Sequence, residues 1–417
     1  MDNVDNVDKV DKVENVDRRE MDLYAKAGLA VSTQELMDRR RRVLEMALAK
    51  GADAGVVLFD PRHVFYLSNF GFIPTERPIA LVVHGDARAE LVVPSLETEH
   101  AEALGFVDEV VAYFEYPTDR HPMIHLADRL GEGRYASDAP GAPGRNGYVG
   151  PSLSEVLGRD VPLLREELRL AMQVKSPQEV ALVRESCRWG HLAHARLQAL
   201  SRAGAGEYEI SHEATLEATR AMVDTLGRDY ARVSPFPVEA HAGFRGQIGA
   251  NSAIPHATTI HAVLKPGDTL VTGAAGRVWG YVSELERTMF VGEPSSEQRR
   301  YFAAMLAAQD LAFATIRPGI EVAEVDREVQ RLMRDAGLMP YVRHHTGHAI
   351  GSDGHESPFF DVGDHTVLAV GMVFSVEPGL YVPGLGGFRH SDTIAVTEDG
   401  CERLTLYPRN LEALVCG

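Results

Sequence analysis

The 417-residue chain is poor in cysteine and has no long apolar run. Its three cysteines, Cys187, Cys401 and Cys416, are too few and too widely spaced for a disulfide framework or a cysteine metal centre. This scarcity is typical of a reducing compartment, so we expect a cytoplasmic protein. No stretch reaches the ~18 apolar residues needed to span a bilayer, and no secretory signal pattern is present. We therefore expect no membrane partner.

Basic runs are also scarce. Asp and Glu number 60 against 42 Lys and Arg, which gives a formal net charge of −18. A surface of this sign repels nucleic acid and anionic lipid, so neither is expected as a partner. The closest approach to a basic run is RRRR at 39–42, inside a helical pattern. An exposed helix face is the favoured interpretation, and an anion site is the alternative.

The composition and the predicted secondary structure of the chain change twice along its length. Residues 1–20 repeat valine, aspartate and asparagine, which favours a disordered low-complexity tail over a short partner-binding helix. Over 21–165, an amphipathic helix at 33–50 and short apolar strands such as GVVLFD alternate with helical segments, which predicts an α/β domain. A second domain is predicted over 170–417.

Helix signals open the second domain. Ser176, Pro177 and Glu179 form an N-cap, a first-turn proline and a capping box, so a long helix should follow them. Strand-like runs such as MVFSVEPGLYV lie between the later helical patterns, and the fold class is therefore α/β of the α+β kind. Further helices are predicted at 207–226, 296–316 and 321–336.

Polar residues gather inside otherwise apolar segments of this second domain. Residues two apart on a strand share a face, so Glu284 and Glu286 of YVSELERTMFV should point the same way, beside Tyr281. Burying a carboxylate costs several kcal/mol unless a positive group pairs with it. A metal, an arginine or a charged substrate is therefore expected beside these acids. The other polar residues of these segments are His256, His345, His348, His355, Glu356, Glu377, Arg389, His390 and Asp392.

The order of these segments resembles the creatinase, prolidase and aminopeptidase P family. ERPIALVV is similar to its N-terminal domain and KSPQEVALVR to its domain junction, and NSAIPH, GHAIG, SVEPGLY and FRHSDT follow in the same order. The resemblance covers nearly the whole chain. It implies a creatinase-like N-terminal domain, a C-terminal pita-bread catalytic domain, and a homodimer with its site near the interface.

The resemblance also implies a test for metal binding. The metal-dependent peptidases of the family use Asp, Asp, His, Glu and Glu as ligands. The matching positions are Gly273, Glu284, His348, Glu377 and Ser391, so two of them carry no ligand. Two adjacent ions need bridging carboxylates, which argues against a dinuclear site. A single ion on Glu284, His348 and Glu377 stays open as an alternative.

The LERT segment is similar to that of creatinase, which hydrolyses a C–N bond without metal. By this resemblance, His256 is the catalytic histidine, and Glu286 and Glu377 hold a cationic substrate group. Arg77 reaches the substrate carboxylate in the neighbouring subunit, and His348 donates to developing negative charge. The substrate-binding set is completed by His355, Arg389, Glu284 and Tyr281.

Three positions depart from creatinase, namely Thr75, Phe359 and Ser391, so creatine itself is not the expected substrate. The main hypothesis is a metal-independent, cofactor-free, creatinase-like hydrolase of a small cationic, carboxylate-bearing amino-acid derivative. The alternatives are an Xaa-Pro dipeptidase or aminopeptidase P with a mononuclear site, a lyase on the same scaffold, and an inactive binding module. A structural alternative pairs Glu286 with Arg287 or Arg389.

Overall fold

The computed structural model describes residues 30–142, 150–227 and 239–417, which form two compact units. The first unit begins at Ala30 and ends at Met172, and the second begins at Gln173. The predicted tail at 1–20 lies outside the described residues. No described helix is both long enough and apolar enough to cross a membrane.

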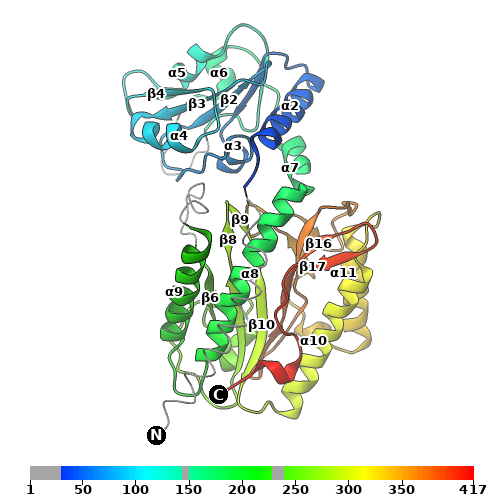
Figure 1. Cartoon of the computed structure of the whole chain (residues 1–417). Helices are drawn as coiled ribbons and strands as arrows, with labels where there is room; N and C mark the ends of the chain where they lie inside the picture. The colour runs from blue at the N-terminus through cyan, green and yellow to red at the C-terminus, as the bar shows by residue number, and fades with distance from the viewer. Residues whose placement is uncertain (1–29, 143–149, 228–238) are drawn as a thin grey trace. The chain divides into compact units, whose positions relative to one another are not determined.

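The N-terminal unit is built on a sheet that, within the described residues, has five strands in the order β4-β3-β2-β1-β5 (Figure 1). Strand β2 pairs antiparallel with β1 and β3, whereas β5 and β4 add parallel strands at the two edges. The strands are β1 (Gly55–Leu58), β2 (Ala80–His84), β3 (Ala89–Pro94), β4 (Glu109–Tyr113) and β5 (Tyr135–Ser137). The helices are α2 (Thr33–Ala49), α3 (Pro61–Ser68), α4 (Thr98–Leu104), α5 (Pro122–Arg129), α6 (Leu153–Leu157) and α7 (Arg165–Gln173).

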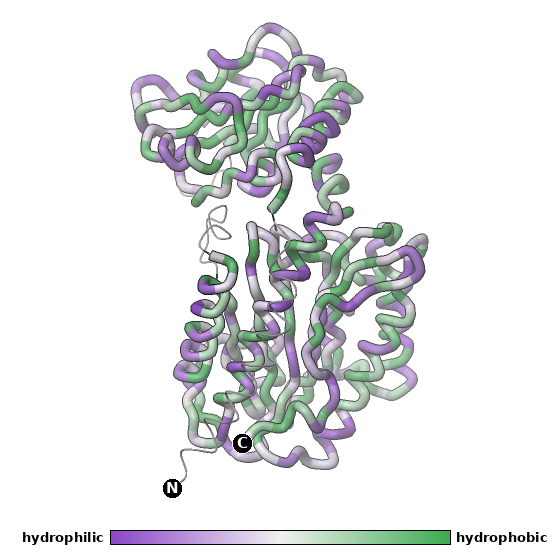
Figure 2. The backbone as a smooth tube through the Cα atoms, viewed as in Figure 1, coloured by the Kyte–Doolittle hydropathy of each residue, from purple (hydrophilic) through white to green (hydrophobic). Residues whose placement is uncertain are grey.

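Two hydrophobic clusters hold this unit together. Val43 and Ala47 of α2 join one cluster, and Met123 and Leu126 of α5 join the other. Figure 2 shows the strands of this unit in green, for hydrophobic residues, whereas purple hydrophilic residues concentrate on α2 and the loops. The alternation of strands and helices predicted over this region is confirmed.

The prediction that residues 39–42 form an exposed helix face is wrong for the first two arginines. Arg39 and Arg40 are buried, because their guanidinium groups donate to backbone carbonyls that end α3. Arg39 Nη1 lies 3.0 Å from the oxygen of Tyr66, and Arg40 Nε lies 3.1 Å from that of Leu67. The last carbonyls of a helix lack intrahelical donors, and these arginines supply them.

The C-terminal unit begins with two long helices. Helix α8 (Pro177–Leu200) starts at the predicted capping box, where Ser176 accepts from the amide of Glu179 and the Glu179 carboxylate accepts from that of Ser176. Helix α9 (Glu207–Leu226) packs against α8, both helices pack on β6, and α8 also packs on β7 (Figure 1). The predicted later helices are confirmed as α10 (Ser296–Thr315) and α11 (Val322–Asp335).

A large curved sheet positions the polar segments of this unit. Within the described residues its strands run in the order β12-β11-β13-β16-β10-β7-β6, with β17 paired to β16 and β18 to β10. The hairpins β8–β9 and β14–β15 lie outside this sheet. The strands are β6 (His241–Gly243), β7 (Thr269–Ala275), β8 (Arg277–Val278), β9 (Tyr281–Val282), β10 (Leu285–Val291), β11 (Gly347–Ala349), β12 (Glu356–Phe360), β13 (Val373–Val376), β14 (Gly379–Val382), β15 (Gly386–Arg389), β16 (Ser391–Val396), β17 (Cys401–Arg403) and β18 (Val415–Cys416).

Candidate active site

The site forms around strand β10, whose residues are all buried. Strand β10 pairs antiparallel with β7 and with β16, and the register places Glu286 opposite Gly273 on one side and Ser391 on the other. A Cβ atom at position 273 would meet only Glu286 Oε1, at 3.7 Å. The space beside the Glu286 carboxylate is therefore open on the β7 side.

Alternation along β10 separates the charges of LERT onto two faces. Arg287 is fully buried, and its Nη2 lies 2.8 Å from Asp392 Oδ1 and 2.9 Å from the carbonyl oxygen of Tyr407. Arg287 therefore pairs with Asp392 on the face opposite to Glu286.

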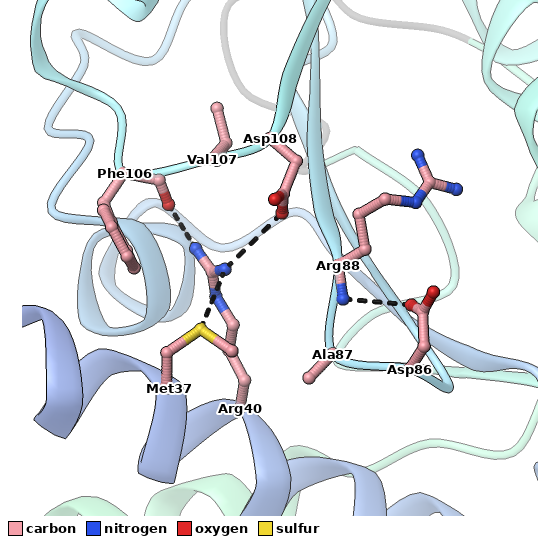
Figure 3. A pocket seen from close by; sticks show the side chains of 8 residues that line it. All are labelled: Met37, Arg40, Asp86, Ala87, Arg88, Phe106, Val107 and Asp108. Atoms are coloured by element: carbon pink, nitrogen blue, oxygen red, sulfur yellow. Dashed lines mark hydrogen bonds and ion pairs between the residues drawn. The ribbon is translucent and has the colours of Figure 1, made fainter.

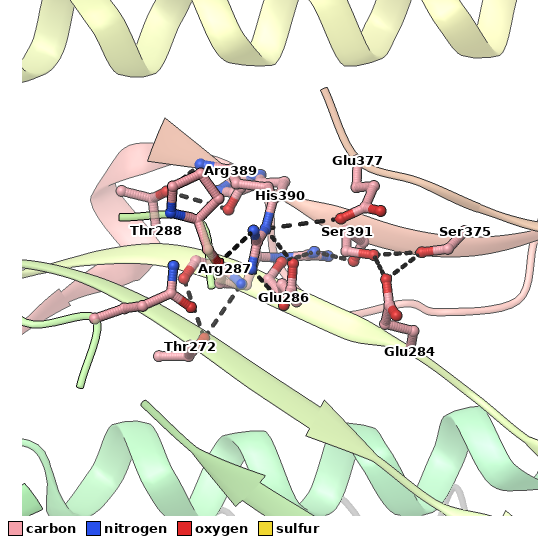
Figure 4. Close-up of polar contacts among 12 residues, drawn as sticks. Thr272, Glu284, Glu286, Arg287, Thr288, Ser375, Glu377, Arg389, His390 and Ser391 are labelled. Atoms are coloured by element: carbon pink, nitrogen blue, oxygen red, sulfur yellow. Dashed lines mark hydrogen bonds and ion pairs between the residues drawn. The ribbon is translucent and has the colours of Figure 1, made fainter. Parts of the chain in front are cut away.

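Arg389 is the partner of Glu286. Its guanidinium donates to both carboxylate oxygens, with Nη2 at 2.6 Å from Oε1 and Nε on Oε2 (Figure 4). Both side chains are almost fully buried. Of the two structural pairings considered from the sequence, the structure shows the one with Arg389. The predicted need for a cation beside this acid is thus met by the protein itself.

Burial has the largest effect on the pKa of Glu286. It raises the pKa of Glu286 to about 7 against the opposing charge of Arg389, and the nearby carboxylates of Glu284 and Glu377 add to the rise. A carboxyl group with such a pKa changes its protonation near neutral pH, which suits an acid–base role.

Glu377 and His348 form a second pair. His348 Nδ1 lies 3.0 Å from the carbonyl oxygen of Ala349, so Nε2 faces the acids, 3.2 Å from Glu377 Oε1 and 3.7 Å from Glu284 Oε2. Burial opposes both charges, but their mutual attraction prevails. It lowers the pKa of Glu377 to about 2, with help from Arg389, and raises the pKa of His348 to about 9.

Glu284 is held by two serine hydroxyls. Ser375 Oγ lies 2.5 Å and Ser391 Oγ 2.6 Å from Glu284 Oε1, and the two hydroxyls lie 2.5 Å from each other (Figure 4). Because Oε1 accepts hydrogen bonds from both hydroxyls, Oε2 is left facing His348. Glu284 and Glu286 do share one face, since the oxygens of Glu284, Glu286 and Glu377 lie within 4.8 Å of one another.

Two further histidines lie at the exposed side of this cluster. The ring of His355 stacks on that of His348, with centroids 3.7 Å apart. Burial lowers the pKa of His355, and the charges of His348 and of nearby His256 add to this. His256 is exposed in the turn that follows residues 249–253. The structure therefore brings His256, His348 and His355 to one region.

Three residues singled out from the sequence have other partners. Arg77 belongs to the N-terminal unit, where its Nε lies 2.6 Å from Glu115 Oε1. The hydroxyl of Tyr281 donates to Glu179 of α8 at 2.6 Å, and Tyr281 is buried. Glu356 pairs with Lys175 at 2.7 Å.

Sequence reasoning missed two residues that touch the cluster. Tyr381 places its hydroxyl 2.8 Å from Arg389 Nη1 and 2.8 Å from His344 Nε2. Arg245 places Nη2 at 3.2 Å from Glu286 Oε1. Arg245 lies outside every quoted motif, and only its position shortly before NSAIPH could have drawn attention to it.

The donor set fits one divalent ion and does not fit two. The ligand atoms of Glu284, His348 and His355 lie within 4.8 Å of one another, and the buried Nε2 of His348 makes no well-formed hydrogen bond. Carboxylate and imidazole donors suit zinc or manganese. Among the described residues, a second ion would have only the acids Glu284, Glu286 and Glu377, because Gly273 has no side chain and the Ser391 hydroxyl is engaged by Glu284. It would have to share Glu284 with the first ion and compete with Arg389 for Glu286.

Comparison with known proteins identifies the family. The metallopeptidase family M24 matches residues 181–398, and the creatinase/prolidase N-terminal domain matches residues 39–137. The chain belongs to metallopeptidase family M24. It combines the creatinase-like N-terminal domain and the pita-bread domain that the sequence predicted, and the family makes it a hydrolase of C–N bonds.

Individual relatives match over almost their whole length. The Xaa-Pro dipeptidase of Pyrococcus horikoshii is 26% identical over 377 residues, covering 90% of this chain and 98% of that protein. A putative dipeptidase of Bacillus subtilis, YkvY, is 26% identical over 389 residues, which cover 90% of this chain and 99% of that protein. Dipeptidase PepE of Mycobacterium ulcerans superposes with a TM-score of 0.75 at 26% identity, with 92% and 98% covered. These relatives favour the Xaa-Pro dipeptidase alternative over the metal-independent main hypothesis.

The N-terminal unit contains a cavity of about 250 Å³, separate from these residues (Figure 3). Arg40 lies in its wall and donates to the carbonyl of Phe106, close to Met37 and Asp108. Because the guanidinium is already held by backbone carbonyls, the cavity offers no uncommitted charge from Arg40.

Proposed function

We propose that the protein is a dipeptidase of the Xaa-Pro type, which hydrolyses the C–N bond of a small peptide with a free carboxylate. The observation that carries this proposal is the convergence of Glu284, Glu286, His348 and Glu377 in one cluster, within a fold that dipeptidases share over almost their whole length. A homodimer with Arg77 contributing across the interface remains part of the proposal.

Glu284 and His348 would hold one divalent ion together with His355, whose ligand atoms lie within 4.8 Å of theirs, and Glu377 lies 3.2 Å from His348 Nε2. Such an ion supplies Lewis-acid polarisation of the scissile carbonyl. Glu377 stays ionised, because its pKa is lowered to about 2 by His348 and Arg389 against burial. The two serines fix Glu284 so that a single oxygen faces the centre.

Glu286 or His256 transfers the proton during hydrolysis. Glu286 has a pKa raised to about 7 by burial, so it can take a proton from water and return it to the leaving nitrogen. His256 is exposed at the mouth of the cluster, and imidazole can exchange protons near neutral pH. Each positioned acid–base group typically contributes ~10²–10⁴-fold.

A specific observation supports a second candidate, the metal-independent creatinase-like hydrolase. Gly273 and Ser391 stand where the resemblance calls for ligands, and His256, Glu286 and Glu377 are all present. Arg389 weighs against it, because a cationic substrate would have to share Glu286 with a guanidinium that already bonds both of its oxygens.

Turnover and metal content together separate the two candidates. The purified protein is assayed with glycyl-proline and alanyl-proline and with creatine and related guanidino acids, with and without a chelator, while metal is measured by mass spectrometry. We expect cleavage of the dipeptides, loss of activity on chelation, and no more than one ion per chain. Glu284→Gln should lower both ion content and rate, and His365→Gln, at an exposed histidine paired with Glu321, should change neither.

Chelator-resistant cleavage of guanidino acids would replace the dipeptidase proposal by the second candidate. Two tightly held ions per chain would contradict the mononuclear site.

A further inference from the structure

Arg245 occupies an unusual backbone position beside the cluster. It follows β6 with a φ of 51°, in the left-handed region that residues other than glycine seldom adopt. The next residue, Gly246, has a φ of 73°, and a Cβ atom there would come within 2.0 Å of the carbonyl oxygen of Thr258. This tight turn fixes the direction in which the Arg245 side chain leaves the strand.

The guanidinium of Arg245 is only partly used by the protein. Nη2 lies 3.2 Å from Glu286 Oε1 and 3.4 Å from Gln247 Oε1. No acceptor among the described residues bonds Nε or Nη1, and the side chain is 48% exposed. An arginine presents five N–H donors, so Arg245 keeps most of them for another partner.

Arg389, the other arginine in contact with these acids, cannot play this part. Its side chain is 2% exposed, Nε and Nη2 bond Glu286, and Nη1 bonds Tyr381. Within the described part of the chain, Arg245 is thus the one arginine that both touches the cluster and reaches solvent. A substrate carboxylate needs such a group, because it enters a site already holding Glu284, Glu286 and Glu377.

We propose that Arg245 determines substrate specificity by binding the carboxylate of the substrate through the exposed N–H groups of its guanidinium. The inference rests on the proposed function for the identity of the substrate, and adds to it a receptor in the same unit as the catalytic acids. A guanidinium matches a carboxylate with two parallel hydrogen bonds, whereas a lysine offers a point charge. The site therefore selects a free carboxylate over the corresponding amide.

The experiment compares acid and amide forms of one probe. Wild type, Arg245→Gln and Arg245→Lys are titrated calorimetrically with L-proline and L-prolinamide, and KM and kcat are measured with glycyl-proline and glycyl-prolinamide. Arg299→Gln is the matched control, since that side chain is 41% exposed and pairs with Glu293 of the same unit. An interaction with a charged group contributes ~1.5–3 kcal/mol, which corresponds to ~10- to 100-fold in affinity.

We expect wild type to bind the acid more tightly than the amide, and Arg245→Gln to weaken binding of the acid alone by ~10- to 100-fold. Arg245→Lys should recover part of the preference, and Arg299→Gln should keep all of it. Wild type that binds both forms equally, or Arg245→Gln that retains the preference, would overturn the inference. If the preference behaves as expected but no dipeptide is cleaved, the proposed function fails and the role of Arg245 stands.

Discussion

At the scale of single residues, the arrangement depends on a buried acid and the arginine that neutralises it. Strand periodicity predicts that Glu284 and Glu286 share a face, and burial cost predicts a positive partner. The sequence does not reveal that the partner is Arg389, because the two residues are 103 positions apart and meet through the pairing of distant strands. Glu284 and Ser375 are 91 positions apart, so their hydrogen bond is equally hidden from the sequence.

Removing Arg389 should destabilise the C-terminal unit. In Arg389→Met, Glu286 loses its main partner while remaining buried, which costs ~3–5 kcal/mol. The double variant Arg389→Met/Glu286→Leu should recover much of this, because no unpaired charge remains. Both tryptophans, Trp189 and Trp279, lie in this unit, so tryptophan fluorescence during urea unfolding reports its stability.

The surface pair Arg299–Glu293 provides the control, since Arg299→Met should change the free energy of unfolding by less than ~1 kcal/mol. A single variant no less stable than the double variant would show that the Glu286–Arg389 pair has little energetic role.

The Lys175–Glu356 pair should make stability depend on pH. Burial raises the pKa of Glu356, but the charge of Lys175 outweighs this and leaves that pKa below its usual 4.5. An acid with a lowered pKa stabilises the fold above its unfolded value, and this contribution is lost as pH falls through the folded pKa. Wild type should therefore exceed Glu356→Gln in stability at neutral pH, by a margin that shrinks below pH 4.5.

Tryptophan fluorescence during urea unfolding at several pH values measures this margin. A margin that stays constant down to the acid limit would show that Glu356 does not carry the effect.

At the scale of elements, helix α8 shows what local sequence can and cannot reveal. Its start was predicted correctly, because Ser176, Pro177 and Glu179 satisfy the helix end by themselves. The second role of Glu179, accepting from the hydroxyl of Tyr281, joins α8 to strand β9 and has no local signal. The assignment of Tyr281 to substrate binding came from its position beside the acids.

Substitution of Tyr281 distinguishes the two roles. Tyr281→Phe removes one hydrogen bond to a buried carboxylate and should lower stability by ~1.5–3 kcal/mol with KM unchanged. Ser176→Ala, which removes the cap at the same helix end, should cost ~1 kcal/mol. Urea unfolding and steady-state kinetics on the same preparations measure both quantities. A raised KM at unchanged stability would instead show that Tyr281 takes part in substrate binding.

At the scale of the whole molecule, the segment order was enough to predict two domains of the observed type. Repeated local patterns sufficed for this, since capping boxes and apolar periodicity act within a few residues. The candidate site was predicted in part: Glu284, Glu286, His348 and Glu377 lie in recognisable segments. Arg245 and Tyr381 were missed. A turn of unusual backbone geometry places Arg245 beside the acids, and the pairing of β14 with β15 places Tyr381 beside Arg389. Arg39 and Arg40 were misplaced because their acceptors belong to another helix.

The glycine opposite Glu286 has a practical consequence for chemical biology. The position where Gly273 would carry a side chain has only one neighbouring atom within 4 Å, and that atom belongs to Glu286. An inhibitor bearing a small substituent aimed at strand β7 would enter this notch, whereas an enzyme with a larger residue at the same position would reject it. An inhibitor of this kind would thus be selective for this enzyme over similar hydrolases, because only a residue without a Cβ atom leaves space for the substituent.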